Sequence, residues 1–475
     1  MRELLLNQVW QSANFLSKAA FLILLTPLML SKWGADQYGL FALASSLLVS
    51  MALLDGGVRA LTRIRMAEAL KNGSEAAFRR AFGEGLVTFT FVASMAAVAG
   101  AALAWTGLPA EWLRLPPGGS LVLAVTVAMT GVFMTTYLVL EPLAARGNLS
   151  TMKAANTWGA IAALPACGLA VWLGASVLTV VMLMSLCSIV PNLVVALRHG
   201  IHRMFPWREH GIFHPAVVFR TLRSGVWYYL TTVSLIIKTH TLTFVVSALA
   251  GPAEAGLFYI LLRLTEIIGN VGATASETSL ASLAAATTAE GRAKRFRQSW
   301  LYVSVFCLHG AIVLALLGEH LLRLWLPDDH QIVLGLGAAM AVFGLTGAVS
   351  RVAVNASMGL GIVKPAALGN LAEALLDVGL ATVGYEAAGL PGLLVGGSLG
   401  LAAMLPVSAR IARMCGESFA ATYAKPLAIL LPGLGVAAVL QALAGLSAWF
   451  APWLAAIALS GGIAALQLRR LHREA

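Results

Sequence analysis

The chain has 475 residues, of which 59% are hydrophobic and 11% charged, and its mean hydropathy is +0.83. This composition excludes a water-soluble globular protein and predicts a multi-pass membrane protein. The net charge of +11 would indicate nucleic-acid binding in a soluble protein, but here the basic residues gather in loops between apolar runs. They therefore indicate membrane topology, and no nucleic-acid partner is expected.

The apolar runs predict an all-α polytopic membrane protein. Backbone groups must be satisfied within the lipid, and the runs have roughly the 18 to 25 residues of helices rather than the short alternations of a barrel. We expect about fourteen transmembrane helices, at residues 12–31, 38–57, 83–106, 120–142, 154–173, 177–197, 224–249, 255–283, 299–317, 332–357, 365–386, 390–409, 426–445 and 451–467.

The orientation follows from the stretch between Tyr38 and Arg65. Its apolar run ends at Asp55-Gly56-Gly57 and is followed by arginines, which the positive-inside rule places in the cytoplasm. Fourteen spans then put 26 basic residues inside and only Lys32, Arg114 and Arg323 outside. Both termini are expected in the cytoplasm of a bacterial inner-membrane protein. The inner loops 59–82 and 199–222 are amphipathic, and we expect their basic side to face anionic membrane lipids.

An internal repeat divides the chain. Residues 34–41 and 251–258 share a G-x-x-[acid or amide]-x-G-L-F frame at an offset of 217. Since both copies follow a span that starts inside, two parallel six-helix lobes with a central cavity between them are expected. The predicted domains are an N-terminal lobe (1–198), a basic cytoplasmic linker (199–223), a C-terminal lobe (224–410), and a segment with spans 13 and 14 and a cytoplasmic tail (411–475).

Three stretches resemble a known family. The run YGLFALASSLLVSMALLDGGVRALTRIRMAEALKNG (38–73) resembles the signature of polysaccharide flippases of the multidrug/oligosaccharidyl-lipid/polysaccharide exporter superfamily, in which a tyrosine-glycine entry precedes a D-x-G end and an arginine. Residues 250–283 resemble the family's span 8, and residues 355–396 its span 11 with the flanking turns. The chain departs from the pattern in having fourteen spans, a number also seen in the lipid II branch.

The resemblance implies a secondary transporter rather than an enzyme. It would flip a polyprenyl-diphosphate-linked oligosaccharide from the inner to the outer leaflet by alternating access, for O-antigen or exopolysaccharide export. A polysaccharide polymerase and chain-length proteins would be possible partners. No cofactor is expected beyond coupling to H⁺ or Na⁺, because the chain lacks G-x-x-x-x-G-K-[ST].

Basic residues inside the spans are the expected substrate-binding set. A charge at the bilayer centre costs at least ~2.5 to 3.5 kcal/mol, so each needs a partner or a role. The family's basic positions in spans 1, 2 and 8 correspond to Lys18, Arg59 and Arg263, and Lys238 in span 7 has no acidic neighbour in its own span. The alternatives are that Lys18 snorkels, Arg59 only sets topology, and Arg263 pairs with Glu266.

Acidic residues inside the spans are the expected ion-coupling set, and they comprise Glu266, Glu373 and Asp377. The last two are four residues apart in span 11, on one helix face. Two carboxylates side by side in a low dielectric suit a proton or Na⁺ site. Pairing with a lysine or arginine of a neighbouring helix is the open alternative.

Three residues are expected to permit helix bending during gating: Pro27 in span 1, and Gly269 and Gly272 in span 8. Close helix packing at the glycines is the alternative. The four cysteines have no CxxC spacing, and no metal site is expected.

Three other functions remain open. A cation-coupled drug exporter of the same superfamily would need acidic groups in its cavity, whereas span 1 offers Lys18. A membrane glycan transferase or ligase would need a large external loop, and the longest here, 107–119 and 318–331, are short. A non-transporting assembly scaffold is the third.

Overall fold

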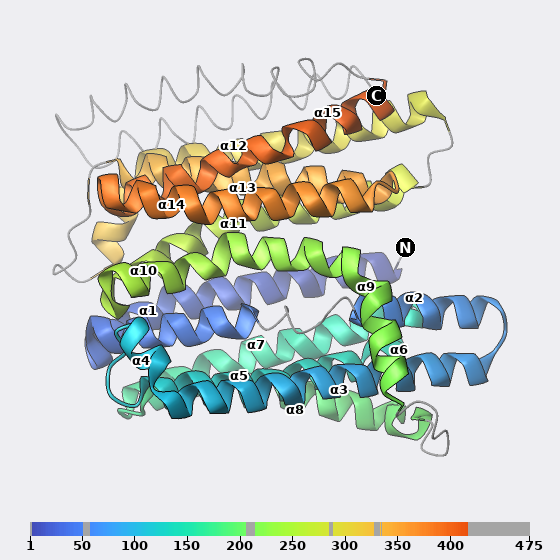
Figure 1. Ribbon diagram of the computed structural model, residues 1–475, viewed down its shortest axis with the longest axis horizontal. Helices are drawn as coiled ribbons and strands as arrows, with labels where there is room; N and C mark the ends of the chain where they lie inside the picture. Colours follow the sequence, from blue (N-terminus) through green and yellow to red (C-terminus); the bar gives the residue numbers. More distant parts are fainter. Residues whose placement is uncertain are drawn as a thin grey trace. The chain divides into compact units, whose positions relative to one another are not determined.

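A computed structural model describes residues 2–50, 58–205, 214–284, 288–326, 333 and 335–416 (Figure 1). The regular structure of these residues is entirely helical, which confirms the predicted all-α class, whereas the two parallel lobes and the cavity between them stay a prediction. Asp55-Gly56-Gly57 and the predicted spans 13 and 14 lie outside the described residues.

Eight helices of the described part are long and apolar enough to cross a membrane, so the protein is a multi-pass membrane protein. The predicted number of fourteen stays a prediction. The eight are Ala13–Leu48, Glu75–Thr106, Gly119–Ala145, Leu149–Trp172, Val177–Arg198, Tyr229–Ala250, Leu336–Gly359 and Val363–Met414.

Two pairs of predicted spans run on without a loop. Spans 1 and 2 fall in one element, α1 (Arg2–Ser50), broken only by the left-handed Gly34 at φ 76°. Spans 11 and 12 fall in α14 (Val363–Leu399), broken at Ala388 and Gly389. A glycine at positive φ reverses or bends the chain in a single residue, so two consecutive helices can follow each other here without a longer loop.

The described chain forms two compact units, each with its own core. Unit 1 comprises residues up to Ile236 together with Thr243–Tyr259, and unit 2 comprises Ile237–Leu242 and the described residues from Ile260 onward. The other elements of unit 1 are α2 (Val58–Lys71), α3 (Glu75–Thr106), α4 (Leu108–Trp112), α5 (Gly119–Val139), α6 (Glu141–Ala145), α7 (Leu149–Trp172), α8 (Val177–Arg198), η2 (Ile201–Met204), α9 (Pro215–Ile236) and α10 (Leu242–Ala250). Those of unit 2 are η4 (Ile237–Thr241), α11 (Pro252–Ala284, from Ile260), α12 (Ala289–Trp325), α13 (Leu336–Gly359), α14, η5 (Gly400–Met404) and α15 (Leu405–Met414).

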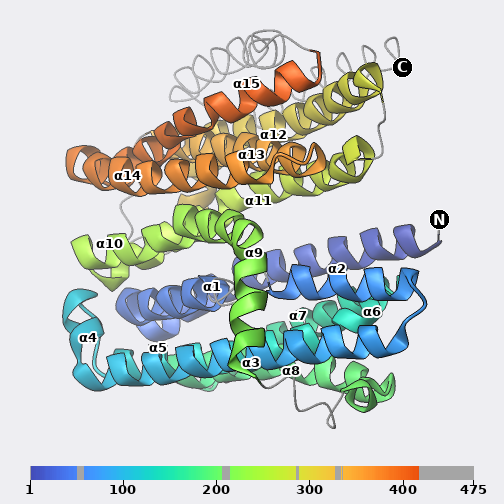
Figure 2. The ribbon, with the colours of Figure 1, turned by 45° about the vertical axis from the view of Figure 1, so that its right-hand side comes forward.

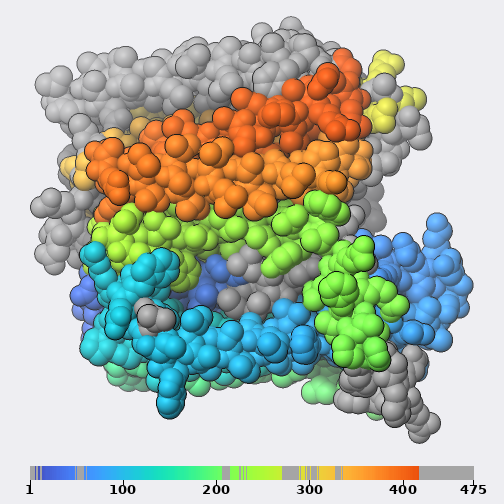
Figure 3. Space-filling model, viewed as in Figure 1, coloured from blue at the N-terminus to red at the C-terminus, as the bar shows by residue number. Residues whose placement is uncertain are grey.

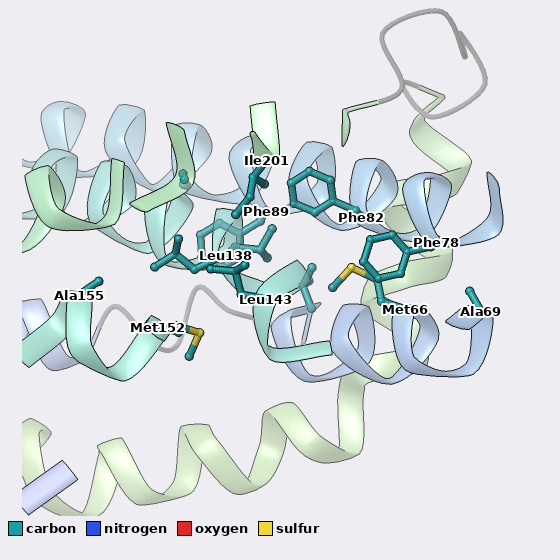
Figure 4. Packing of buried hydrophobic residues seen from close by; sticks show 14 residues of the cluster. Met66, Ala69, Phe78, Phe82, Phe89, Leu138, Leu143, Met152, Ala155 and Ile201 are labelled. Carbon is teal, nitrogen blue, oxygen red and sulfur yellow. The ribbon is translucent and has the colours of Figure 1, made fainter. Parts of the chain in front are cut away.

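In unit 1, α2 and α3 form a helical hairpin. Gly73 at φ 68° makes the turn, and the Ser74 hydroxyl caps α3 by accepting a hydrogen bond from the Ala77 amide. The core of the hairpin contains Met66, Phe78 and Phe82, which are fully or almost fully buried (Figure 4). Helix α9 crosses the hairpin in both ribbon views (Figures 1 and 2).

The repeated glycine frames meet within unit 1. Gly34 and Gly251, the first residues of the two copies, both have positive φ, of 76° and 98°. A Cβ added to Gly256 would lie 3.1 Å from the Cα of Gly39, and one added to Gly39 would overlap the carbonyl of Pro252. The shared motif therefore serves both a bend before each helix and the close approach of the two helices at their glycines.

Labelling of single cysteines tests the predicted topology. With the four native cysteines replaced, a cysteine at Asn72 in the α2–α3 turn is expected to react only with reagents that reach the cytoplasm. One at Glu111 in α4 is expected to react with an impermeant reagent added outside. Both positions are exposed. The reverse pattern would overturn the orientation derived from the 26 to 3 distribution of basic residues.

Candidate functional site

Lys238 occupies a buried site in unit 2. It lies in η4, a five-residue π-helical segment between α9 and α10, and only 4% of its side chain is exposed. Single π-turns inside helices are frequent at functional sites, because the extra residue re-aims a side chain. Here the Lys238 ammonium donates to Glu373 Oε1 and lies 3.2 Å from Asp377 Oδ2.

The two carboxylates come from adjacent turns of α14, and both side chains are 0% exposed. Ser350 in α13 donates its hydroxyl to Glu373 Oε2 at 2.6 Å. Neither oxygen of Asp377 makes a well-formed hydrogen bond to any described residue, although Oδ2 is close to the ammonium. Asp377 is thus the less satisfied member of the group that we call the lysine triad: Lys238, Glu373 and Asp377.

The lysine triad carries one more negative than positive charge when all three groups are ionised. Burying an ion pair costs free energy because both charges lose their water, and burying a charge without a partner costs more still. A single proton on either carboxylate would balance the triad. The ammonium of Lys238 lies next to both carboxylates, in the place that a bound metal cation would take.

A second charged group lies close to the triad in the chain. Arg263 and Glu266 are joined by a 2.6 Å hydrogen bond one turn apart on α11, and His240 Nε2 is 3.6 Å from Glu266 Oε1. Arg351 reaches the same helix, since a Cβ added to Gly269 would be 3.6 Å from the Arg351 Cζ. We call Arg263, Glu266, His240 and Arg351 the arginine–glutamate group.

The two groups share their supporting segments. Lys238 and His240 are two residues apart in η4, and Ser350 and Arg351 are consecutive in α13. A movement of η4 would therefore change both groups at once. The lysine triad and the arginine–glutamate group are thus linked because their residues lie close together in the chain, within η4 and within α13.

The other two expected substrate-binding residues belong to unit 1. Lys18 is exposed on α1. Arg59 in α2 is partly exposed, with its guanidinium 3.5 Å from Glu141 Oε1 and 4.7 Å from the centre of the Tyr137 ring. Arg63, one turn on, holds the same carboxylate more tightly, at 2.6 and 2.9 Å.

The expected gating residues lie inside helices. Pro27 is within α1, whose non-helical residue is Gly34, and Gly269 and Gly272 are within α11. Gly269 is buried, and a Cβ there would make only an ordinary van der Waals contact with the Arg351 guanidinium, at 3.6 Å. A role in bending stays a prediction.

Sequence reasoning missed three contributors to the site: His240, Ser350 and Arg351. Arg351 was counted with the cytoplasmic charges although it falls inside the predicted span 332–357. A signal existed for His240 and Arg351, because both are titratable residues within apolar runs. None existed for Ser350, since serine is tolerated anywhere in a membrane helix.

Gly400 is expected to be required for the lysine triad. A Cβ at this position would overlap Asp377 Oδ1 and lie 2.7 Å from the Glu373 carbonyl oxygen. Gly400→Ala should lower stability by about 1 to 3 kcal/mol through overpacking, and it should impair transport by displacing Asp377. Gly379→Ala is the matched control, because it is an exposed glycine of α14 with nothing within 4 Å of a Cβ. Thermal unfolding in detergent should separate the two variants, and equal midpoints would contradict the crowding at Gly400.

Comparison with known proteins identifies the fold. No family model and no curated protein sequence matches the chain. Among solved structures, the lipid II flippase MurJ in an inward closed conformation matches with a TM-score of 0.72 at 10% identity, over 98% of this chain and 99% of that one. The chain has the fold of the MOP-superfamily transporters.

Two multidrug transporters match the same fold. An inward-facing MATE family transporter of the MOP superfamily gives a TM-score of 0.66 at 14% identity, over 83% of this chain and 95% of that one. The MATE multidrug transporter DinF-BH, solved as a complex, gives 0.63 at 14%, over 86% and 95%. All three neighbours are transporters rather than enzymes, and at such identities the MOP fold is shared while the substrate is left open.

Proposed function

We propose that the chain is a proton-coupled secondary transporter that flips a polyprenyl-diphosphate-linked oligosaccharide from the inner to the outer leaflet for O-antigen or exopolysaccharide export. The observation that carries the coupling is the buried lysine triad. The substrate class is supported by the basic residues of the spans, the signature stretches, and the nearly complete overlap with a lipid II flippase.

Protons suit the lysine triad better than sodium ions. Na⁺ binds through several oxygen ligands, and the ammonium of Lys238 already occupies the position between the two carboxylates. A proton needs only one carboxylate oxygen, and Asp377 offers two that lack a well-formed hydrogen bond to the described residues. Protonation would leave Lys238 with one anionic partner instead of two and so loosen its hold on η4.

Loosening η4 would affect the chain on both sides of it. Residues 237–242 belong to unit 2, whereas α9 and the residues from Thr243 onward belong to unit 1. The ion pairs of Lys238 thus fasten residues 237–242 to unit 2, although the residues before and after this segment belong to unit 1. We propose that proton uptake releases this segment during alternating access.

A drug exporter is the second candidate, because two of the structural neighbours are multidrug transporters. The acidic residues of unit 1 argue against a cation as substrate. Glu141 is held by Arg59 and Arg63, and Glu84 is held by three further arginines. These carboxylates are neutralised, whereas a diphosphate needs cations to replace its water.

Deletion of the gene in its own host tests the proposed function. Cells lacking the protein should accumulate the lipid-linked oligosaccharide in the inner leaflet and lose the surface polysaccharide. The intact gene should restore both. Normal surface polysaccharide together with increased sensitivity to cationic dyes would instead identify a drug exporter.

A further inference from the structure

Arginines hold each of two buried glutamates in unit 1, at the end of the unit where α2, α3, α6 and α9 meet. Glu84 in α3 lies within 3.6 Å of Arg65, 3.2 Å of Arg80 and 3.4 Å of Arg220. Glu141 in α6 pairs separately with Arg59 and Arg63, as described above. We call the three arginines that share Glu84, namely Arg65, Arg80 and Arg220, the arginine cluster.

The Glu84 carboxylate is more buried than the guanidinium groups around it. The side chain of Glu84 is 9% exposed, whereas those of Arg65, Arg80 and Arg220 are 28%, 57% and 59% exposed. The cluster therefore carries two more positive charges than its one carboxylate balances. Three guanidinium groups carry about 15 N–H donors, and one carboxylate accepts about four hydrogen bonds, so the cluster has more donors than Glu84 can accept from.

The cluster is rigidly supported. Phe78, Phe82 and Met66 pack between α2 and α3 (Figure 4). Arg220 of α9 pairs with Glu84 of α3, and the green atoms of α9 lie beside the blue atoms of the hairpin in Figure 3. Arginines fixed on helices lose little further freedom on binding a ligand. Guanidinium groups held in place in this way are suited to donate hydrogen bonds to the oxygen atoms of a phosphate.

Apolar side chains next to the arginines distinguish a lipid from a free anion. Ile64 lies between Arg63 and Arg65 and is 41% exposed, and Phe219 precedes Arg220 and is 68% exposed. Exposed apolar residues beside basic ones are typical of helices that lie in the headgroup region of a membrane. The distribution of basic residues along the chain predicts that this end of unit 1 lies in the cytoplasm.

We propose that the arginine cluster is a binding site for the phosphate headgroup of an anionic phospholipid at the cytoplasmic surface of the membrane. The lipid phosphate would bridge arginines of α2, α3 and α9, and its acyl chains would lie against Ile64 and Phe219. Occupancy would hold α9, which leads into η4, against the α2–α3 hairpin. The site is independent of the proposed substrate.

Native mass spectrometry of the full-length protein in detergent tests the site, with dioleoylphosphatidylglycerol as the probe. Phosphatidylcholine with the same acyl chains is the neutral comparison, and inorganic phosphate and pyrophosphate are the comparison for free anions. Phosphatidylglycerol should bind at least about tenfold more tightly than phosphatidylcholine. Arg65→Gln with Arg220→Gln should weaken its binding about thirtyfold, since each basic residue near an anionic headgroup contributes a factor of about five.

The matched control is Arg198→Gln, an exposed arginine in the last turn of α8, on the same predicted side of unit 1. It should bind phosphatidylglycerol as the wild type does. If the double variant does not fold, each single variant still leaves Glu84 two of its arginines, and each should weaken binding about fivefold. Unchanged binding in folded variants, equal binding of the two lipids, or a preference for inorganic phosphate or pyrophosphate would each overturn the proposal.

Discussion

Replacement of Lys238 by methionine is expected to abolish transport and to lower the free energy of unfolding by about 3 to 5 kcal/mol, because it leaves an uncompensated buried charge. Glu373 and Asp377 are both fully buried, and Lys238 is the cation within ion-pair distance of both among the described residues. Methionine keeps the length of the side chain, so the change removes the charge without leaving a large cavity. Thermal unfolding in detergent and transport in proteoliposomes measure the two effects. Lys32→Met, at an exposed lysine of α1, is the control and should change neither.

A triple variant separates structure from coupling. Lys238→Met with Glu373→Gln and Asp377→Asn removes all three charges, so most of the lost stability should return. Transport should not return in a pH-dependent form, because no group of the lysine triad can then take up a proton. A triple variant that transports with the pH dependence of the wild type would show that the lysine triad is only structural.

The second large effect is expected at Lys18 and Arg263. If these residues hold the diphosphate, Lys18→Ala and Arg263→Ala should each abolish or severely weaken polymer export at normal protein abundance. Each charge-assisted contact to a buried anion is worth roughly 1.5 to 3 kcal/mol, or about a ten- to hundredfold change in affinity. Lys18→Arg should retain part of the activity, since charge matters here more than the fork geometry of the guanidinium.

Arg263 needs its own control, because it also balances Glu266 at 2.6 Å. Arg263→Ala with Glu266→Ala removes both charges and leaves His240 without its carboxylate neighbour. If Arg263 binds substrate, the double variant should be as inactive as the single one. Restored export in the double variant would mean that Arg263 only neutralises Glu266.

The sequence was most informative about features that depend on residues close together in the chain. Hydrophobic runs predicted the helices. The two copies of the repeated glycine frame begin at Gly34 and Gly251, which both have positive φ in the structure, although the frame alone did not predict a bend there. The spacing of Glu373 and Asp377 placed both carboxylates on one face of α14. The separation of three residues allowed a pair between Arg263 and Glu266 as an alternative to substrate binding, and the structure contains this pair.

Sequence reasoning failed where the partner is distant in the chain. Lys238 and Glu373 are 135 residues apart, and Ser350 and Glu373 are 23 apart on different helices. From the sequence, Lys238 was expected to bind substrate and the two carboxylates to hold an ion, with pairing to a cation of another helix left as an alternative. The structure joins the three, because the π-turn of η4 directs Lys238 towards α14, and no periodicity reveals such a turn.

Transport by the purified full-length protein in proteoliposomes tests the central claim most directly. The substrate would be a fluorescent disaccharide on a short polyprenyl diphosphate, with a cationic rhodamine dye as the comparison. A pH gradient imposed without Na⁺ should drive the glycolipid across the bilayer, a Na⁺ gradient without a pH gradient should not, and the dye should stay on its own side. Movement of the dye without the glycolipid, or glycolipid movement that requires Na⁺, would contradict the account.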